Sequence, residues 1–120
     1  MERITSFISA ACLFTAACFS PVQSSESRML TSWYGPGFHG ILTANGEVYN
    51  QMGHTAAHKT LPFNTKLRVC YEGCVDVRIN DRGPYIGARE LDLSYAAARK
   101  IGLLNPGVAT TSIEYLSTRG

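Results

Sequence analysis

The chain has 120 residues, of which 45% are hydrophobic and 17% charged, with 11 glycines and 5 prolines. This size and composition exclude a multidomain protein, a disordered tail and a long coiled coil, and they predict one small, turn-rich domain with mainly β structure. The net charge is +2 without a block of like charges, which excludes a dense phosphate-binding face, so nucleic acid is not an expected partner.

The first 24 residues have the layout of a secretory signal peptide. Two charged residues precede the apolar stretch Ile4–Phe19, which is shorter than the roughly 20 residues of a membrane-spanning helix. We therefore expect an exported protein, located in the periplasm, in the cell envelope or outside the cell. Cleavage after Ser24 would release a soluble product, which we favour. Cleavage before Cys18 would leave a lipid anchor, but Thr15 stands where lipoprotein signals usually carry an aliphatic residue.

The predicted domain covers residues 31–117 and follows a polar leader at residues 25–30. It begins with a β-prone run at Thr31–Tyr34. From Gly35 to Gly53 the glycines recur so often that long helices are excluded and loops or short strands are expected. The next segment, His54–Lys59, is predicted to form a helical turn.

A hairpin is predicted around the two cysteines of the domain. Apolar and polar residues alternate in Lys66–Cys70 and again in Cys74–Ile79, which is the period of strands with one buried face. The three residues between them fit a short hairpin loop. Cys70 and Cys74 then point outward, opposite each other, and a disulfide between them would stabilise the fold by about 2 kcal/mol. A CxxxC metal site is the alternative.

The rest of the chain adds a helix to the predicted barrel. In chain order we expect a turn at Asn80–Pro84, a strand at Arg89–Leu93, a helix at Tyr95–Ile101 and a last strand at Thr111–Leu116. The helix would be capped by Asp92 or Ser94 and stopped by Gly102. Together the elements predict one small β-barrel with one or two short helices.

Among the acids of the domain, Asp81 is the first candidate for chemistry. It lies where an apolar strand runs into a Gly-Pro turn. A carboxyl at such a barrel rim can be partly buried, and burial raises carboxyl pKa values toward the range of a general acid. The alternative is that Asp81 only hydrogen-bonds its own turn. Glu47 lies in the glycine-rich segment, where a carboxylate could accept hydrogen bonds from sugar hydroxyls or be an exposed turn acid.

Histidines and aromatic residues supply further candidates. His54 and His58 are four residues apart, so on a helical turn they would share a face as two zinc ligands could, but no third ligand is near in the sequence. His58 alone, orienting or hydrogen-bonding a substrate, is the preferred interpretation. Aromatic residues near the turns could stack on sugar rings or fill the core: Trp33, Tyr34, Tyr49 and Tyr85.

Five short motifs follow one another along the domain: SWYG at 32–35, TANGE at 43–47, TAAHKTLP at 55–62, VRINDRGP at 77–84 and LDLS at 91–94. In this order they resemble the rare lipoprotein A (RlpA) family. The resemblance covers residues 31–116 and implies a six-stranded double-psi β-barrel, the fold of expansins and barwin-like proteins. It also implies a lytic transglycosylase of the septal-ring type, which acts on peptidoglycan glycan strands without a metal or organic cofactor.

By position, the resemblance makes Asp81 the catalytic acid and links Glu47 and His58 to activity. Asn50 stands where the family commonly has an aspartate. In the mechanism that the resemblance implies, Asp81 protonates the oxygen between N-acetylmuramic acid and N-acetylglucosamine. The C6 hydroxyl of the muramic acid then attacks C1 and gives its proton to Asp81, which leaves a 1,6-anhydro end. Glu47 and His58 would hold the sugar, with Asn50 as a neutral hydrogen-bonding substitute.

Two other kinds of function stay open beside the enzyme. In the enzyme, Arg82 and the four aromatic residues would bind the glycan. The protein is expected to be a monomer. An expansin-like module would bind wall glycan without cleaving it, and Asn50 and the small size favour it. A secreted effector or inhibitor of barwin type would act on another organism. The combination of Asp81, Glu47 and His58 favours the enzyme, because a binding module has less need of an acid at the turn.

Overall fold

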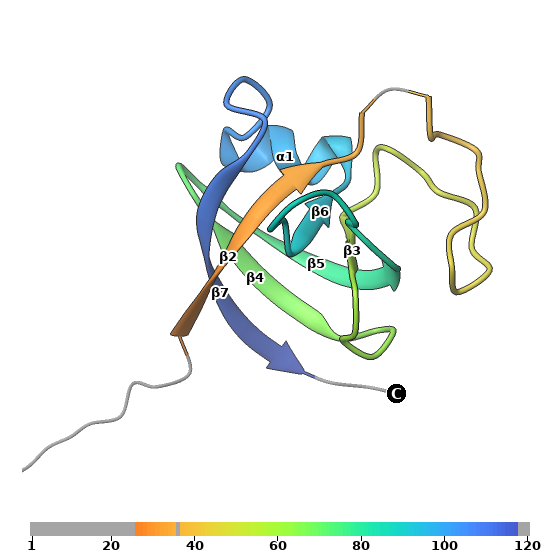
Figure 1. The fold of residues 1–120 in the computed structure, drawn as a ribbon, viewed down its shortest axis with the longest axis horizontal. Coiled ribbons are helices and arrows are strands. Elements are labelled where there is room, and N and C mark those ends of the chain that lie inside the picture. Colours follow the sequence, from red (N-terminus) through yellow and green to blue (C-terminus); the bar gives the residue numbers. More distant parts are fainter. Residues whose placement is uncertain (1–25, 36, 118–120) are drawn as a thin grey trace, which may run out of the picture.

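Six strands close into a barrel in the computed structural model, which describes residues 26–35 and 37–117. The elements in chain order are β2 (Glu26–Trp33), β3 (Thr55–His58), β4 (Lys66–Cys70), β5 (Cys74–Asp81), β6 (Leu91–Leu93), α1 (Tyr95–Ile101) and β7 (Ala109–Ser117). Around the barrel the strand order is β2-β6-β3-β5-β4-β7. Figure 1 shows α1 at one end of the barrel and the long loop between β2 and β3 projecting beside it. The predicted β-barrel with a short helix is confirmed.

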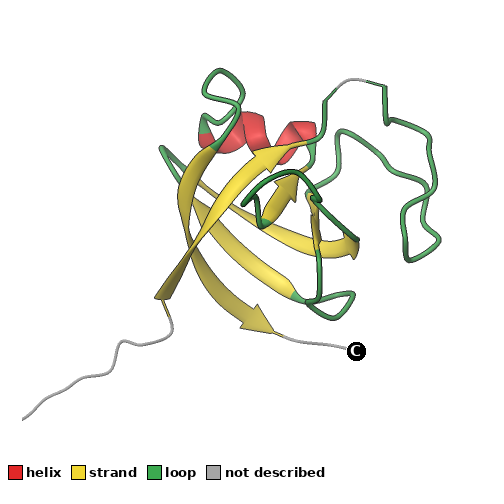
Figure 2. Cartoon of the chain, viewed as in Figure 1, coloured by secondary structure: helices red, strands yellow, loops and turns green. Residues whose placement is uncertain are grey.

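The barrel mixes parallel and antiparallel pairs. β2 runs parallel to β6, and β3 runs parallel to β5. The other four neighbouring pairs are antiparallel. The projecting loop after β2 leads to β3, and the turn after β5 leads to β6 (Figure 2). In each case one other strand lies between the two connected strands in the barrel.

The core follows the alternation that the sequence predicts. In β4, and in β5 as far as Ile79, every second residue is buried, and the buried set faces the barrel interior. Two leucines of β6 and one face of α1 complete it. The core residues named here are at most 3% exposed: Leu67, Val69, Val75, Val77, Ile79, Leu91, Leu93, Ala97, Ala98, Ile101 and Ile113.

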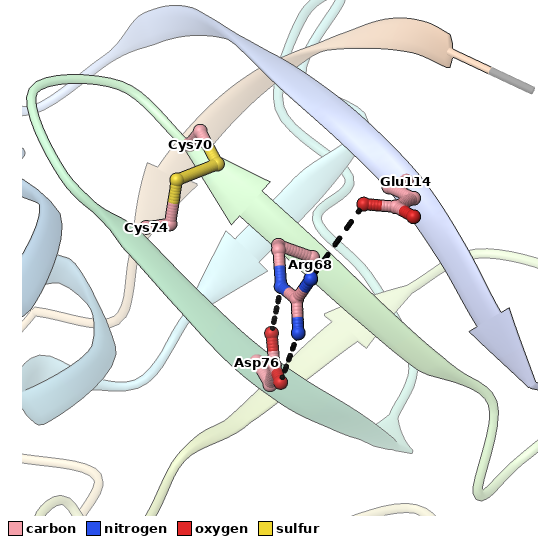
Figure 3. Close-up of a disulfide and its surroundings, with 5 residues drawn as sticks. All are labelled: Arg68, Cys70, Cys74, Asp76 and Glu114. Atoms are coloured by element: carbon pink, nitrogen blue, oxygen red, sulfur yellow. Dashed lines mark hydrogen bonds and ion pairs between the residues drawn. A yellow bond between two sulfur atoms is a disulfide. The ribbon is translucent and has the colours of Figure 1, made fainter.

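The hairpin of β4 and β5 has the predicted register. Cys70 pairs with Cys74, and the two form a disulfide with a Cα–Cα distance of 4.1 Å. The disulfide uses both thiols, so the CxxxC metal alternative is wrong. On the same outer face Arg68 binds Asp76 through two hydrogen bonds of 2.7 and 3.0 Å and approaches Glu114 of β7 at 3.8 Å (Figure 3).

The helix α1 begins and ends as its sequence predicts. The Ser94 hydroxyl accepts a hydrogen bond from the amide of Ala97 at 3.2 Å, so Ser94 is the N-cap. Gly102 takes the left-handed conformation with φ 83° and ends the helix. Asp92, the other predicted cap, lies in β6 instead.

Two local predictions differ from the structure. The segment His54–Lys59 is not a helical turn, because Thr55–His58 forms β3, which is hydrogen-bonded to β5 on one side and β6 on the other. Pairing on both sides outweighs the helix propensity of Ala56 and Ala57. The predicted leader at residues 25–30 belongs largely to β2, which starts at Glu26 and pairs with β7. Backbone hydrogen bonds to β7 hold this mostly polar stretch in the barrel. Side chains on the outer face of a strand need not be apolar.

The N-terminal predictions fall on another part of the chain. The predicted signal peptide, residues 1–24, and Cys18 lie outside the described residues. Among residues 26–35 and 37–117, no helix is long and apolar enough to cross a membrane.

Candidate active site

A row of four residues crosses four strands of the barrel. Ser32 of β2 pairs with Asp92 of β6, Asp92 pairs with Ala57 of β3, and Ala57 pairs with Asp81 at the end of β5. Residues in register on neighbouring strands point to the same face of a sheet. The barrel topology therefore brings two carboxyls, carried by the non-neighbouring strands β5 and β6, to one face.

A cleft of about 320 Å³ lies over this row. Asp81, Ala57 and Asp92 line it together with aromatic side chains and two arginines. Five of the predicted site residues line this cleft: Asp81, Trp33, Tyr34, Arg82 and Tyr85. The sequence interpretation missed Asp92 and Arg89, which line it as well. A signal for Asp92 was present, because it alternates with two buried leucines and must face away from the core.

Asp81 is held by three hydrogen-bond donors. The Tyr34 hydroxyl donates to Oδ2 at 3.0 Å. The amides of Ala44 and Arg82 donate to Oδ1 at 2.9 and 2.8 Å. Only the Arg82 contact is local to the predicted turn. The contacts from Tyr34 and Ala44 come from the segments after β2 and in the projecting loop, so Asp81 does more than close its own turn.

Tyr34 forms one wall of the cleft. Its ring stacks on Tyr49 with centroids 4.6 Å apart and meets Phe38 edge to face at 5.9 Å. Burial raises the pKa of the Tyr34 hydroxyl, and the neighbouring Asp81 charge raises it further. Tyr34 therefore stays a hydrogen-bond donor to Asp81 throughout the physiological pH range.

Asp92 is the second carboxyl of the cleft. Its Oδ1 accepts a hydrogen bond of 2.8 Å from the hydroxyl of Ser32, which is 2% exposed. Burial raises the pKa of the Asp92 carboxyl, the Ser32 bond and the Arg89 charge oppose the rise, and the Asp81 charge adds to it.

Glu47 lies outside the cleft and binds protein groups. Both of its oxygens accept hydrogen bonds from Arg78, at 2.7 and 2.9 Å. The side-chain amides of Asn80 and Asn45 each donate another at 3.0 Å. The bonds from Arg78 and Asn80 lower the pKa of Glu47 to about 2. Glu47 thus fastens residues 43–47 to β5, and the same loop carries the Ala44 amide that binds Asp81.

His58 is not among the residues that line the cleft, although it follows Ala57 and its carbonyl accepts a hydrogen bond from Arg82. Its Nδ1 accepts hydrogen bonds from the amides of Thr60 and Leu61, both at 3.1 Å. Burial lowers the pKa of His58, although the nearby Glu90 charge opposes this change. The imidazole is therefore neutral and holds the turn after β3. Of Glu47, His58 and Asp81, only Asp81 lines the cleft.

A second pocket of about 330 Å³ adjoins the cleft, because Trp33, Tyr34 and Gly35 line both. Tyr49 and Tyr95 line the second pocket. Tyr49 is only 3% exposed, so it serves the core and presents little surface to a ligand. Asn50 lines neither cavity; its Oδ1 accepts a hydrogen bond from the amide of Met52 at 3.0 Å.

Arg82 and Tyr85 lie on the turn after β5. The Arg82 guanidinium lies 3.9 Å from the centre of the Phe63 ring and donates to the carbonyl of His58 at 3.2 Å. Tyr85 is 72% exposed, so its ring is free to contact a ligand.

The zinc interpretation of the two histidines has no geometric support. His54 precedes β3 and His58 is the last residue of β3, so the two do not share a helical turn. His54 lines a surface pocket beside Cys74 and Lys100. Within the described part of the chain, no group of three or more histidine, cysteine, aspartate or glutamate side chains could hold a metal ion.

The closed six-stranded barrel, with two carboxyls and aromatic walls in one cleft, defines a protein of the double-psi β-barrel class. A family model described as lytic transglycolase matches residues 26–113. The chain belongs to this family, which confirms the resemblance to the rare lipoprotein A proteins.

Relatives of known name are similar to the chain across the barrel. The probable endolytic peptidoglycan transglycosylase RlpA of Synechocystis is 53% identical over 88 residues, which are 71% of this chain and 27% of the relative. The endolytic peptidoglycan transglycosylase RlpA of Helicobacter pylori J99 is 49% identical over 94 residues, 76% of this chain and 30% of the relative. The chain thus spans less than a third of the length of either.

Solved structures share the fold at low sequence identity. The Streptomyces papain inhibitor superposes with a TM-score of 0.62 at 20% identity, over 78% of this chain and 96% of the inhibitor. The Clavibacter michiganensis expansin superposes with a TM-score of 0.63 at 19% identity, over 79% of this chain and 52% of the expansin. At this identity the likeness establishes the fold alone.

Proposed function

We propose that the protein is a peptidoglycan lytic transglycosylase, a lyase of the exported or envelope compartment. It cleaves the bond between N-acetylmuramic acid and N-acetylglucosamine and leaves 1,6-anhydro ends. The observation that carries the proposal is Asp81, presented to an aromatic-walled cleft by three donors from separate segments. The names of relatives about 50% identical across this barrel support the same substrate.

The reaction needs two proton movements and no water. One proton goes to the glycosidic oxygen as the bond to C1 breaks, and one leaves the C6 hydroxyl as its oxygen bonds to C1. Asp81 is the catalytic residue that takes the second proton. Its fixed position favours this role, because a general base must lie within hydrogen-bond reach of the proton that it abstracts.

The cleft walls suit a sugar chain. Trp33 and the exposed ring of Tyr85 offer flat apolar faces for pyranose rings. Arg82, whose guanidinium is oriented by Phe63, offers donors to sugar oxygens or to a carboxylate. The shared wall of Trp33 and Tyr34 continues the surface into the second pocket, so a glycan of several residues could lie along both.

Glycan binding without cleavage is the alternative, and Asn50 was its main support. Because Asn50 bonds to its own turn outside both cavities, the absence of a carboxylate there removes no acid from the cleft. This geometry favours the enzyme.

The test is mass spectrometry of purified glycan strands after incubation with the protein, beside Asp81→Asn with its thermal stability measured. We expect anhydromuramic ends from the wild type alone. If neither protein releases fragments while both sediment with the glycan, the enzyme proposal is refuted and the binding module takes its place.

A further inference from the structure

The cleft holds a carboxyl that the proposed reaction has not used. Asp92 of β6 and Asp81 of β5 are each paired in register with Ala57 of β3, which lies between them. All three residues line the cleft. Because paired residues point to one face, the two carboxyls face the same space across the methyl group of Ala57.

The strand spacing sets the separation of the two acids. Neighbouring strands lie about 4.8 Å apart, so two spacings put the Cα atoms of Asp81 and Asp92 about 10 Å apart. Enzymes that cleave glycosidic bonds with two carboxyls hold the carboxyl groups roughly 5 to 9.5 Å apart, on either side of the reacting bond. Side chains on this Cα spacing can reach the upper part of that range. The small side chain of Ala57 leaves the space between the two acids open to a sugar.

The two carboxyls have different surroundings. Asp81 accepts hydrogen bonds at both oxygens from three donors, an arrangement that suits a carboxylate. Asp92 accepts one, from Ser32. Burial raises the pKa of Asp92, so it keeps its proton to higher pH than an exposed aspartate.

Charged and titratable groups reach Asp92 from four segments. Asp81 faces it from β5, and Arg89 from the segment before β6. Tyr34 and Tyr49, whose hydroxyls have pKa values raised mainly by burial, face it from the segment after β2 and from the projecting loop. Both tyrosines are neutral near pH 7, so Asp81 and Arg89 are the charges that act on Asp92.

We propose, on the basis of the proposed transglycosylase function, that Asp92 is a second catalytic residue and supplies the proton for the leaving group, the role that the family resemblance gives to Asp81. The bond between C1 of the muramic acid and the glycosidic oxygen breaks, its electron pair stays on that oxygen, and the oxygen takes the Asp92 proton. The C6 oxygen bonds to C1 and its proton passes to the Asp81 carboxylate. The resting state returns when that proton moves through solvent from Asp81 to Asp92.

The first experiment compares Asp92→Asn with Asp81→Asn and with Asp76→Asn, a matched change at an exposed acid of β5 far from the cleft. We expect Asp92→Asn to lower kcat about 100-fold or more, with glycan sedimentation and thermal stability near those of the wild type. Asp76→Asn should keep wild-type kcat. Anhydro ends formed by Asp92→Asn at the wild-type rate would overturn the inference and leave the proposed function intact.

Ser32→Ala separates a proton donor from a structural residue. Loss of the Ser32 bond should move the alkaline limb of the kcat profile to higher pH, since that bond favours the ionised form of Asp92. An unmoved alkaline limb would refute the assignment.

NMR of the carboxyl carbons measures the protonation of Asp92 directly and does not require turnover. Asp92 should bind its proton at a higher pH than Asp76, whose pKa is lowered mainly by its hydrogen bond to Arg68. If Asp92 titrates together with Asp76, the inference fails whether or not the protein cleaves glycan. If Asp92 titrates higher but the wild type leaves no anhydro ends, the proposed function fails and the catalytic role of Asp92 fails with it.

Discussion

Glu47→Gln tests whether Glu47 fastens the 43–47 loop or binds sugar. The wild-type carboxylate accepts two hydrogen bonds from Arg78 and one from Asn80. Glutamine keeps the shape but loses the charge and cannot accept all of these bonds. Because the loop carries the Ala44 amide that donates to Asp81 at 2.9 Å, loosening it should disturb the catalytic carboxyl from outside the cleft.

The lowered pKa of Glu47 sets an upper limit on the stability that Glu47→Gln should lose. A fall from 4.5 to about 2 corresponds to about 3.4 kcal/mol at about 1.36 kcal/mol per pKa unit for a fully shielded group. The Glu47 side chain is 40% exposed, so solvent screening reduces the expected loss of stability to about 1 to 2 kcal/mol. Since the folded pKa is depressed, this contribution is present above pH 4.5 and disappears as the pH falls toward 2.

Urea unfolding at several pH values, with kinetics on glycan strands, makes the measurement. Glu47→Gln should be less stable than the wild type at pH 7, the two should converge toward pH 2, and kcat should fall with KM nearly unchanged. Glu114→Gln, an exposed acid 3.8 Å from Arg68, is the control and should stay within about 0.5 kcal/mol of the wild type. Unchanged stability with a raised KM would refute the fastening role and favour a sugar ligand.

Three further predictions address single contacts. Tyr34→Phe keeps the stack on Tyr49 but removes the donor to Asp81, so kcat should fall about tenfold in the glycan assay; an unchanged kcat would make the contact irrelevant to catalysis. Replacing both cysteines of the hairpin by serine should lower the free energy of unfolding by about 2 kcal/mol and leave kcat unaltered, and a large loss of kcat would contradict the separation of disulfide and cleft. His58 should contribute stability that is present above pH 6.5 and is lost as the pH falls through its lowered pKa. In His58→Ala that loss of stability below pH 6.5 should vanish from urea titrations, and its persistence would show that another group titrates there.

The hairpin and the helix could be predicted from the sequence because each depends on residues close together in the chain. Alternation in Lys66–Cys70 and Cys74–Ile79 set which side chains are buried, and the short loop set the register that joins the cysteines. Ser94 and Gly102 bound the helix through contacts within one turn. Asp81 at the end of its strand was found for the same reason.

Contacts between distant segments escaped the same reasoning. The segment Thr55–His58 has no strong strand signal, and it is a strand because β5 and β6 pair with it from both sides. Glu47 and His58 were predicted at the sugar. Spacing alone did not reveal that the Glu47 carboxylate binds Arg78, or that Nδ1 of His58 accepts hydrogen bonds from the turn after β3.

The sequence by itself determined the mainly β composition, the disulfide hairpin, the capped helix and the importance of Asp81. Only the tertiary structure decided which acid shares the cleft with Asp81. That partner is Asp92, because closure of the barrel brings β5, β3 and β6 into register. Register between strands distant in sequence is set by how the whole core packs, and no local pattern carries that information.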